Sequence, residues 1–480
     1  MGLPDAAVRE SRDRVRSAIK NAGFDFPIKK ITVNMAPADI RKEGPLYDLP
    51  IAVGILNATD QLDVSGLGRC AFIGELSLNG QVRGVTGALP HVLAAREKEM
   101  TACVIPAENA GEARLVKGME IYPVQSLRDL SDLLTNGNMG ERCLSFSREE
   151  LTPKDTGFGS PDFNEVRGQY LAKRALEVAA AGGHNLLMVG SPGSGKTLLA
   201  RCLPGILPDM TFEESMEVAK IYSLAGLIKN CRTLVTRRPF RSPHSTASTI
   251  SLVGGGKYPR PGEISLAHHG VLFLDEMPEF QRDALEALRQ PLEDGTVTIT
   301  RLNASVTYPA RITLLAACNP CPCGYFGSPT RECKCSPLQV SRYLGRISGP
   351  LLDRFDIIVG VAPLSYEDLN EKKPGEGSSA IKERVSAARL LQQERFRGQF
   401  NTCNSSMTGN QARIHCKISR EAGGLLKTAY RDFNLSARAH DRIIKVARTL
   451  ADLAHSSKIE AHHLAEALQY RGHESIFGKI

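Results

Sequence analysis

The sequence predicts an α/β protein with a parallel β-sheet at its core. Between about residue 171 and residue 363, short apolar runs alternate with segments of helical periodicity, which is typical of strand–helix units in parallel sheets. One of these apolar runs leads directly into a glycine-rich loop and then into a helix. The end of the chain instead shows successive helical patterns without strands. These observations predict a sheet-based core followed by a helical domain.

Length and composition limit the class of protein. A chain of 480 residues predicts about three domains, and 42% hydrophobic with 23% charged residues is ordinary for a soluble globular protein. No apolar run approaches the length of roughly 18 residues that suggests a membrane span, and the N-terminus lacks the order of a secretory signal. We therefore expect a cytoplasmic protein with no membrane partner. The net charge of +8 is compatible with nucleic acid but equally typical of a solvated surface.

The first domain, predicted for residues 1–137, mixes short helix and strand signals. Ile31–Met35 alternates and predicts a strand, whereas Pro50–Leu56 predicts a buried helix. Cys103–Pro106 and Glu120–Val124 predict short strands. Residues 138–161 are rich in Gly, Ser, Pro and charge and predict a linker.

The second domain, residues 162–363, is the predicted core, and residues 364–480 form the predicted helical domain. Four helices are expected in the latter, at Ile381–Phe396, Glu421–Phe433, Ala437–Ala454 and Glu460–Tyr470.

A phosphate-binding loop is the strongest motif. The run Asn185–Val189 predicts a strand, and a helix follows the eight residues Gly190, Ser191, Pro192, Gly193, Ser194, Gly195, Lys196 and Thr197. In such a loop the backbone N–H groups surround the phosphates, the lysine reaches the β- and γ-phosphates, and the threonine hydroxyl holds Mg²⁺. We therefore expect ATP and Mg²⁺ as cofactors, because a chance glycine-rich turn would not be flanked by this strand and helix.

A second apolar strand supplies the acidic groups that such a site needs. Val271–Leu274 precedes Asp275, which is expected to hold Mg²⁺, and Glu276, which is expected to polarise the attacking water. The alternative is an acidic helix cap after a core strand. The phosphate loop with Lys196 disfavours it, because such a loop needs an acid that holds the metal ion.

Two further residues are candidates for the chemistry. Asn319 follows the apolar run Ile312–Ala317 and is suited to sense the γ-phosphate, although Asn before Pro320 is also a common turn residue. Arg354 is suited to act as a finger on the nucleotide of a neighbouring subunit, the alternative being a surface pair with Asp356.

Five of the twelve cysteines fall between Cys318 and Cys335. Four of them form a C-x-C pair, nine residues, and a second C-x-C pair: Cys321, Cys323, Cys333 and Cys335. Four thiolates on two short pincers suit structural Zn²⁺, although C-x₂-C is the commoner pincer. The alternatives are reduced structural cysteines or a redox pair. Cys318 is expected to be a buried thiol.

Together these motifs resemble those of the AAA+ ATPases, specifically the magnesium-chelatase-like branch known as the ComM/YifB family. The matching stretches are Asp162–Gln169, the phosphate loop, Arg238–His244, Pro261–His268, Asn319–Gly324 and Ser348–Asp356. The resemblance implies an AAA+ P-loop NTPase core with an N-terminal Lon-like α+β domain and a C-terminal helical lid. It identifies Asn319 as sensor 1, Arg354 as the arginine finger and Arg438 as sensor 2; without it, Arg438 would be taken as a solvated helix position. It also implies a homo-oligomeric ring, usually a hexamer, with ATP at each subunit boundary.

The resemblance further implies two insertions that point into the pore of the ring. A helix-2 insert between Ser245 and His269 carries Lys257, Tyr258 and Arg260, and a β-hairpin over Thr296–Tyr308 carries Arg301 near its turn. These four residues are candidates for DNA contact. The alternative is an ordinary hairpin beside a glycine-rich loop.

The Lon-like domain lacks the protease's catalytic residues. Gly44–Asp48 occupies the place of the nucleophilic serine, and His91 falls at or near the place of the lysine, so we expect no peptidase activity. Family members usually carry extra strands before the Gly-Leu-Pro-Asp motif on which this chain starts. We therefore expect an incomplete N-terminal fold with an exposed edge strand.

For function, the resemblance implies an ATP-hydrolysing ring motor on single-stranded or branched DNA, a ComM-like helicase or branch-migration translocase in natural transformation. The alternatives are a chelatase-type motor subunit and a protein-remodelling ATPase. The pairs His268–His269 and His462–His463 are expected to be structural.

Overall fold

The structure, a computed structural model, describes residues 6–35, 44–135, 139–146, 160–228, 236–256, 259–301, 304–328, 331–363, 375–398, 403–433 and 435–471. The chain divides into two compact units. The first contains Met1–Lys154 and Phe212–Thr236, and the second contains Asp155–Thr211 and Arg237–Ile480. Among the described residues, no helix has the length and apolar character needed to cross a membrane.

The first unit is built on a parallel three-stranded sheet in the order β1-β4-β5. Its strands are β1 (Cys70–Phe72), β4 (Ala102–Pro106) and β5 (Glu120–Val124), with a small antiparallel pair of β2 (Glu75–Leu76) and β3 (Val82–Arg83). Its helices are α1 (Ala6–Asn21), α2 (Asp48–Ala58), α3 (Ala88–Glu97), α4 (Ala110–Ala113), α5 (Leu127–Thr135), α6 (Met139–Arg142) and α9 (Phe212–Leu224). The two strands and the helix predicted here at β4, β5 and α2 are confirmed.

Two stretches of the first unit differ from the sequence prediction. Residues 31–35 form no strand, so the prediction from their alternating pattern is wrong. Ile31 and Val33 are exposed, and no strand in the described part of the chain pairs with them. Residues 139–146, placed in the predicted linker, pack on this unit instead. Arg142 forms a 2.7 Å ion pair with Asp129, and Leu144 pairs with Ile121.

Helix α9 also belongs to the first unit, although its sequence lies inside the predicted core domain. Met216 and Ala219 of α9 are buried in one apolar cluster with Leu89 and Val92 of α3. The backbone N–H of Gly87 donates to the carbonyl of Ser223 at 3.1 Å. Local sequence gives no sign of this packing, because an amphipathic helix does not specify which apolar surface covers it.

The second unit is built on a five-stranded parallel sheet in the order β14-β6-β13-β10-β7. The strands are β6 (Leu186–Gly190), β7 (Phe240–Arg241), β10 (Val271–Leu274), β13 (Thr313–Cys318) and β14 (Ile357–Val361). The described residues of β6, β10 and β14 are almost all buried, as expected for strands covered by helices on both faces. This confirms the predicted parallel-sheet core.

Helices and two hairpins surround this sheet. The helices are α7 (Tyr170–Gly182), α8 (Lys196–Ile206), α10 (Thr249–Val253), α11 (Glu263–Leu266), α12 (Arg282–Glu286), α13 (Arg289–Asp294), α14 (Pro337–Leu344) and α15 (Gly349–Leu352). The hairpins pair β8 (Gly254–Gly255) with β9 (Arg260–Pro261), and β11 (Thr296–Arg301) with β12 (Ala304–Pro309). The hairpin predicted for Thr296–Tyr308 is therefore confirmed.

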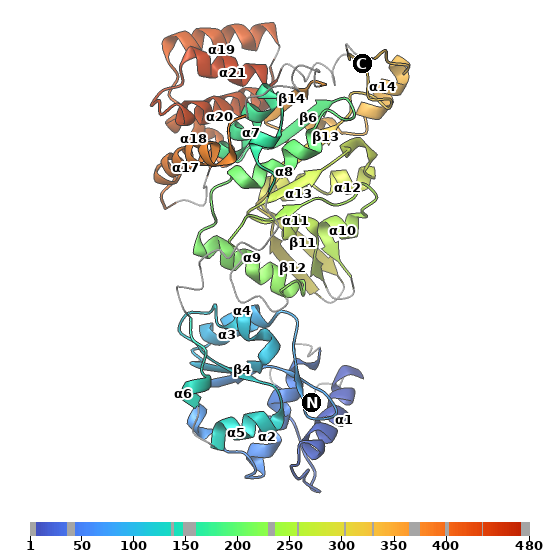
Figure 1. The fold of residues 1–480 in the computed structure, drawn as a ribbon, viewed down its shortest axis with the longest axis vertical. Helices are drawn as coiled ribbons and strands as arrows, with labels where there is room; N and C mark the ends of the chain where they lie inside the picture. The colour runs from blue at the N-terminus through green and yellow to red at the C-terminus, as the bar shows by residue number, and fades with distance from the viewer. Residues whose placement is uncertain are drawn as a thin grey trace. The chain divides into compact units, whose positions relative to one another are not determined.

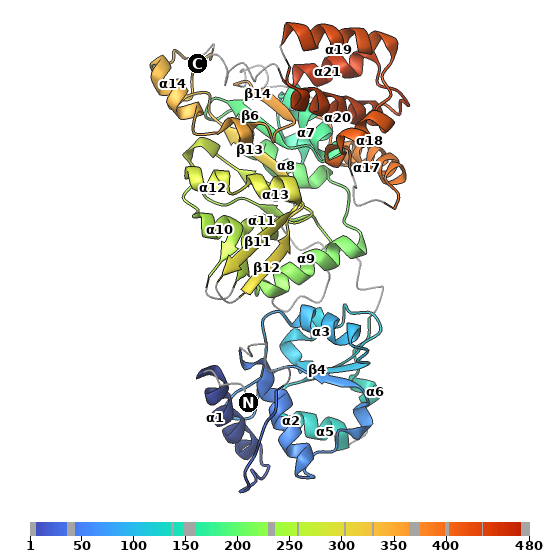
Figure 2. The same ribbon diagram turned by 180° about the vertical axis from the view of Figure 1, so that it is seen from behind.

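The last helices form the lid. They are α17 (Ser378–Arg395), α18 (Gly409–His415), α19 (Arg420–Asp432), α20 (Ala437–Leu453) and α21 (Ala461–Gln469), of which only α18 was not predicted. Both views show them gathered beside α7 and β14, with α14 on the other side of the sheet (Figures 1 and 2).

A buried histidine ties the lid to the sheet. His184, after α7, contacts Asp356 through Nδ1 at 3.0 Å and Thr449 of α20 through Nε2 at 2.8 Å. Since Asp356 immediately precedes β14, this polar bridge joins the lid to the segment that carries Arg354.

Candidate nucleotide-binding site

The phosphate loop follows β6 and precedes α8, as the motif requires. Gly193 and Gly195 have φ of 76° and 91°, a region that other residues rarely adopt. The hydroxyl of Ser194 is buried and has no hydrogen-bond partner among the described residues. Such an orphaned group inside a loop of backbone N–H donors fits a site built to take up a further acceptor.

Lys196 is the first residue of α8 and is 8% exposed. Its Nζ donates to the carbonyls of Gly190 at 2.8 Å and Ser191 at 2.9 Å, and lies 3.2 Å from Oδ1 of Asn319. Burial lowers the pKa of this amine. The hydrogen-bond partners of the Lys196 ammonium are thus uncharged oxygens. A phosphate would bind the ammonium more strongly than these oxygens do, because it carries the opposite charge.

Strand order explains why Asn319 reaches Lys196. β13 lies between β6 and β10, so the carboxyl ends of all three strands meet at one edge of the sheet. Asn319 follows β13, and its side-chain oxygen contacts Lys196 of the phosphate loop. The predicted sensor and the loop lysine are thus brought together.

The predicted magnesium ligands also meet. The Thr197 hydroxyl donates to Oδ2 of Asp275 at 2.7 Å. A hydroxyl and a carboxylate in contact are an oxygen donor set that suits Mg²⁺, which keeps several waters and the nucleotide phosphates as its other ligands. These two residues would hold the ion beside the phosphates.

Glu276 departs from ordinary strand geometry. Its φ is 50°, in the left-handed region, and its side chain is exposed. Its backbone N–H donates to Oδ1 of Asp275 at 3.0 Å. Residues other than glycine that adopt such backbone conformations cluster at functional sites.

Arg354 lies beside an acidic residue that the sequence did not suggest. Its Nη2 is hydrogen-bonded to the carboxylate of Glu293 at the end of α13, not to Asp356. Its Nε is buried with no hydrogen-bond partner among the described residues. The Arg354–Glu293 ion pair would therefore have to break before Arg354 could act as an arginine finger on a neighbouring subunit.

Arg438, in the first turn of α20, is 72% exposed and lies 4.0 Å from the Asp353 carboxylate. Arg442, one turn later, is buried and donates to Asp353 at 3.0 Å and to the carbonyl of Phe355 at 3.3 Å. Arg438 thus keeps the freedom that its predicted role as sensor 2 requires, while Arg442 fixes the helix to the segment around Arg354.

Gln169 is a site residue that sequence reasoning missed. Its Nε2 donates to the carbonyl of Ser194 at 3.2 Å and to that of Ala362 at 2.6 Å, and its φ is 55°. It lies in the Asp162–Gln169 stretch already noted for the family resemblance, which was the available signal. It connects the phosphate loop to the end of β14.

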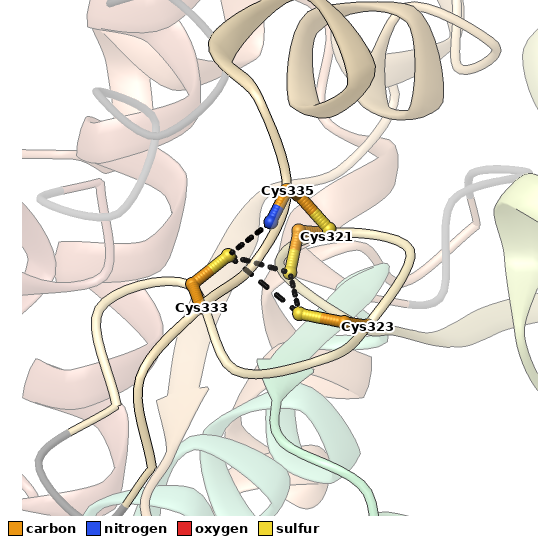
Figure 3. Close-up of side chains that lie close together, drawn as sticks. All are labelled: Cys321, Cys323, Cys333 and Cys335. Carbon is orange, nitrogen blue, oxygen red and sulfur yellow. Dashed lines mark hydrogen bonds between the residues drawn. The ribbon is translucent and has the colours of Figure 1, made fainter.

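The four cysteines converge as predicted (Figure 3). The Sγ atoms of Cys321, Cys323 and Cys333 are 3.3–3.6 Å apart, and all four sulfurs lie within 4.8 Å of one another. A tetrahedral ion with Zn–S bonds of about 2.3 Å separates its sulfurs by about 3.8 Å, so this arrangement fits one Zn²⁺. Cys318 is buried on β13, and burial raises the pKa of its thiol to about 12.

The two inserts pack on each other. Lys257 and Tyr258 lie outside the described residues. Arg260 on β9 and Arg301 at the end of β11 are both exposed. A methyl group placed on Gly255 would lie 3.1 Å from Nη2 of Arg301, and the Tyr308 hydroxyl donates to the carbonyl of Pro259 at 2.7 Å. The two hairpins therefore contact each other, and each carries an exposed arginine.

In the first unit, the segment at the place of the protease nucleophile is held by ionic contacts. Asp48 is fully buried and accepts from Ser11 and from Nε of Arg14, the latter at 2.8 Å. His91, at the place of the lysine, is exposed on α3.

Comparisons with known proteins agree with this arrangement. Family models for magnesium chelatase match three segments: subunit ChlI at residues 1–109 and again at 162–369, and the ChlI C-terminal region at 375–471. The competence protein ComM of Haemophilus influenzae is 46% identical over 485 residues, covering 100% of this chain and 93% of ComM. The chain belongs to the ComM/YifB family of magnesium-chelatase-like AAA+ ATPases.

YifB of Escherichia coli is 44% identical over 478 residues, covering 98% of this chain and 90% of YifB. Lon protease 2 of Bacillus subtilis is 28% identical over 128 residues, which is 26% of this chain and 23% of the protease. These matches support the ComM/YifB architecture of a Lon-like domain and an AAA+ core. Membership also implies ATP and Mg²⁺, which the loop, Thr197 and Asp275 fit.

Proposed function

We propose that this ComM/YifB chain is an ATP-driven ring motor that acts on single-stranded or branched DNA. The observation that carries the proposal is the contact between the β8–β9 and β11–β12 hairpins of the AAA+ core, each of which carries an exposed arginine, Arg260 and Arg301. Two arginines on adjacent hairpin tips suit contacts to successive phosphates of a nucleic-acid backbone.

A ring would give Arg354 a nucleotide on which to act. In an AAA+ ring a nucleotide lies at the boundary between subunits, where an arginine from the neighbour stabilises charge on the transferred phosphoryl group. The Arg354 side chain is 22% exposed, and its partner Glu293 is 60% exposed. We expect ATP-dependent assembly, most simply a hexamer, to bring Arg354 to a neighbour's phosphate loop.

In the resulting cycle each residue of the site has one task. The backbone of the phosphate loop and Lys196 would bind the phosphates. Thr197 and Asp275 would hold the metal ion, which would neutralise the charge of the phosphates. Glu276 orients and polarises the attacking water. Asn319 would contact the γ-phosphate together with Lys196, and Arg438 of the lid would contact the nucleotide.

Stimulation of ATPase activity by DNA tests the proposal. The full chain is assayed at low salt with forked, single-stranded and duplex DNA, with an unfolded protein as a comparison, because backbone contacts weaken as salt rises. Forked or single-stranded DNA is expected to stimulate turnover. Stimulation by unfolded protein alone would point to protein remodelling, and a flat response to every DNA would refute the DNA motor.

The double variant Arg260→Ala with Arg301→Ala should lose the DNA stimulation and keep basal turnover. Arg282→Ala, which removes an exposed charge of α12 outside the hairpins, is the matched control and should respond as the unaltered protein does. Equal responses of the two variants would contradict the assigned DNA surface.

We also propose that Cys321, Cys323, Cys333 and Cys335 bind one structural Zn²⁺. A closed set of four thiolates leaves no position for substrate, so the ion would have no catalytic role. Metal analysis should find one zinc per chain, and the four thiols should react with a thiol reagent only after chelation. Zinc-free protein with four freely reacting thiols would refute the site.

A further inference from the structure

The loop that carries the first two cysteines lies directly against the phosphate loop. A methyl group placed on Gly324 would lie 2.4 Å from Cδ and 2.6 Å from Cγ of Pro192. Carbon atoms do not approach this closely, so only glycine permits the contact. Gly324 also has a φ of 83°, which glycine adopts without strain.

The position of Gly324 depends on the cysteines on either side. It follows Cys323 in the chain, its N–H donates to the carbonyl of Cys321 at 2.9 Å, and the N–H of Phe326 donates to the Cys321 sulfur at 3.3 Å. Apart from the cysteines, the small core that the described residues form here consists of Val340, Tyr343 and Leu344 of α14. So few apolar side chains stabilise the cysteine loop only weakly, so a bound metal ion would be the main determinant of the loop's conformation.

The same module touches the other side of the nucleotide site. Arg346, just beyond α14, donates from Nη1 to the carbonyl of Pro278 at 3.1 Å and to the Glu279 carboxylate at 3.1 Å. Pro278 and Glu279 follow Glu276 in the chain. The cysteine module, which comprises the cysteine loop from Cys321 to Cys335 and α14 with Arg346, therefore contacts both the phosphate loop and the segment after Glu276.

We propose that metal bound by the four cysteines controls nucleotide binding, because the metal-held loop presses Gly324 against Pro192 and so supports the phosphate loop. This inference rests on the zinc site proposed above. Loss of the metal releases the cysteine loop, the support at Pro192 is lost, and ATP affinity falls although no residue of the phosphate loop has changed. Gly324 acts here as a positioning residue.

Two glycines of the same loop provide a matched test. Gly327 also has a left-handed φ, 72°, but a methyl group on it would meet nothing within 4 Å. Gly324→Ala and Gly327→Ala thus add the same strain, and only the first adds a clash with Pro192. The Kd for a fluorescent ATP analogue should rise on the order of tenfold in Gly324→Ala and remain near the unaltered value in Gly327→Ala.

Zinc content and circular dichroism of both variants check that the module and the fold persist. Gly324→Ala with full zinc, a normal spectrum and weaker nucleotide binding supports the contact. Equal Kd values for the two variants overturn it. If Gly324→Ala alone fails to fold, it is combined with Pro192→Ala, which removes the ring carbons that the added methyl group meets. Recovery of the fold and of nucleotide binding in the double variant supports the contact, and no recovery overturns it.

Metal removal gives the second arm. Zinc is removed from the unaltered protein with a chelator, the chelator is then removed, and binding is titrated at one constant Mg²⁺ concentration. The Kd for the ATP analogue should rise, and re-addition of Zn²⁺ should restore it. The same treatment should change the Kd of Gly324→Ala little. Zinc-free and zinc-loaded protein with one common Kd would overturn metal control. If no zinc binds at all, the zinc site fails, while a difference between the two glycine variants still reports on the contact itself.

Discussion

Nζ of Lys196 lies 3.2 Å from Oδ1 of Asn319, 123 positions away in the chain. The two residues follow neighbouring strands of the sheet, and the contact joins the residue proposed to bind phosphate to the residue proposed to sense it. Because Lys196 has carbonyls and an amide as partners here, arrival of a phosphate replaces neutral acceptors with a charged one.

Replacement of that amine should abolish nucleotide binding. Lys196→Ala leaves the carbonyls of Gly190 and Ser191 without their donor and removes the only cation seen inside the loop. We expect binding of the ATP analogue to weaken by at least roughly two orders of magnitude, as for loss of a buried charge-assisted contact. Titration by fluorescence checks this, and near-normal affinity would contradict the assigned site.

Glu276→Gln should separate binding from chemistry. The amide keeps the size of the side chain but cannot polarise water as a carboxylate does, so turnover should fall on the order of 10³-fold while affinity is retained. Steady-state phosphate release and analogue binding are measured on the same preparation. Retained hydrolysis would assign the base to another residue.

Arg354→Ala should bind ATP normally and hydrolyse it slowly, by a factor on the order of 10³, because a finger acts only on the transition state. Glu293→Gln, which removes the intramolecular partner of Arg354, should keep its activity. Mixing tests whether the arginine acts across a boundary. Lys196→Ala subunits carry an intact Arg354, so adding them to Arg354→Ala subunits should recover part of the turnover; no recovery argues against action in trans.

The first unit should lose stability as the pH rises above the ordinary carboxyl pKa. Glu112 is 4% exposed and accepts from Asn109 at 2.7 Å, and burial raises its pKa above 4.5. Between 4.5 and the raised value the folded state binds more protons than the unfolded chain, so the free energy of unfolding falls as pH rises through this window.

Glu112→Gln should flatten that dependence, since the amide does not titrate. Calorimetric melting of the first-unit transition across mildly acidic pH measures the slope. Glu108→Gln, an exposed carboxyl four residues away, controls for the change of charge alone. The same slope in Glu112→Gln and the unaltered protein would exclude Glu112 as its source.

Local pattern determined the parts of the site that are continuous in sequence. The phosphate loop, the Asp275 strand, the β11–β12 hairpin and the cysteine pincers each have a spacing that allows few other structures, and the structure has them where predicted. Periodicity also gave four of the five lid helices, because an apolar stripe at helical spacing is a strong local signal.

Tertiary structure alone decided which partners these elements meet. The ion pair of Arg354 with Glu293, the bridge from His184 to Thr449 and the packing of α9 on the first unit join residues far apart in the chain, and no local pattern specifies such pairings. The strand predicted at residues 31–35 failed for the same reason, since alternation gives a strand only where a neighbour can pair with it. The contact of Gly324 with Pro192 is the sharpest case: the sequence contains both residues, but only the folded sheet edge brings the cysteine loop against the phosphate loop.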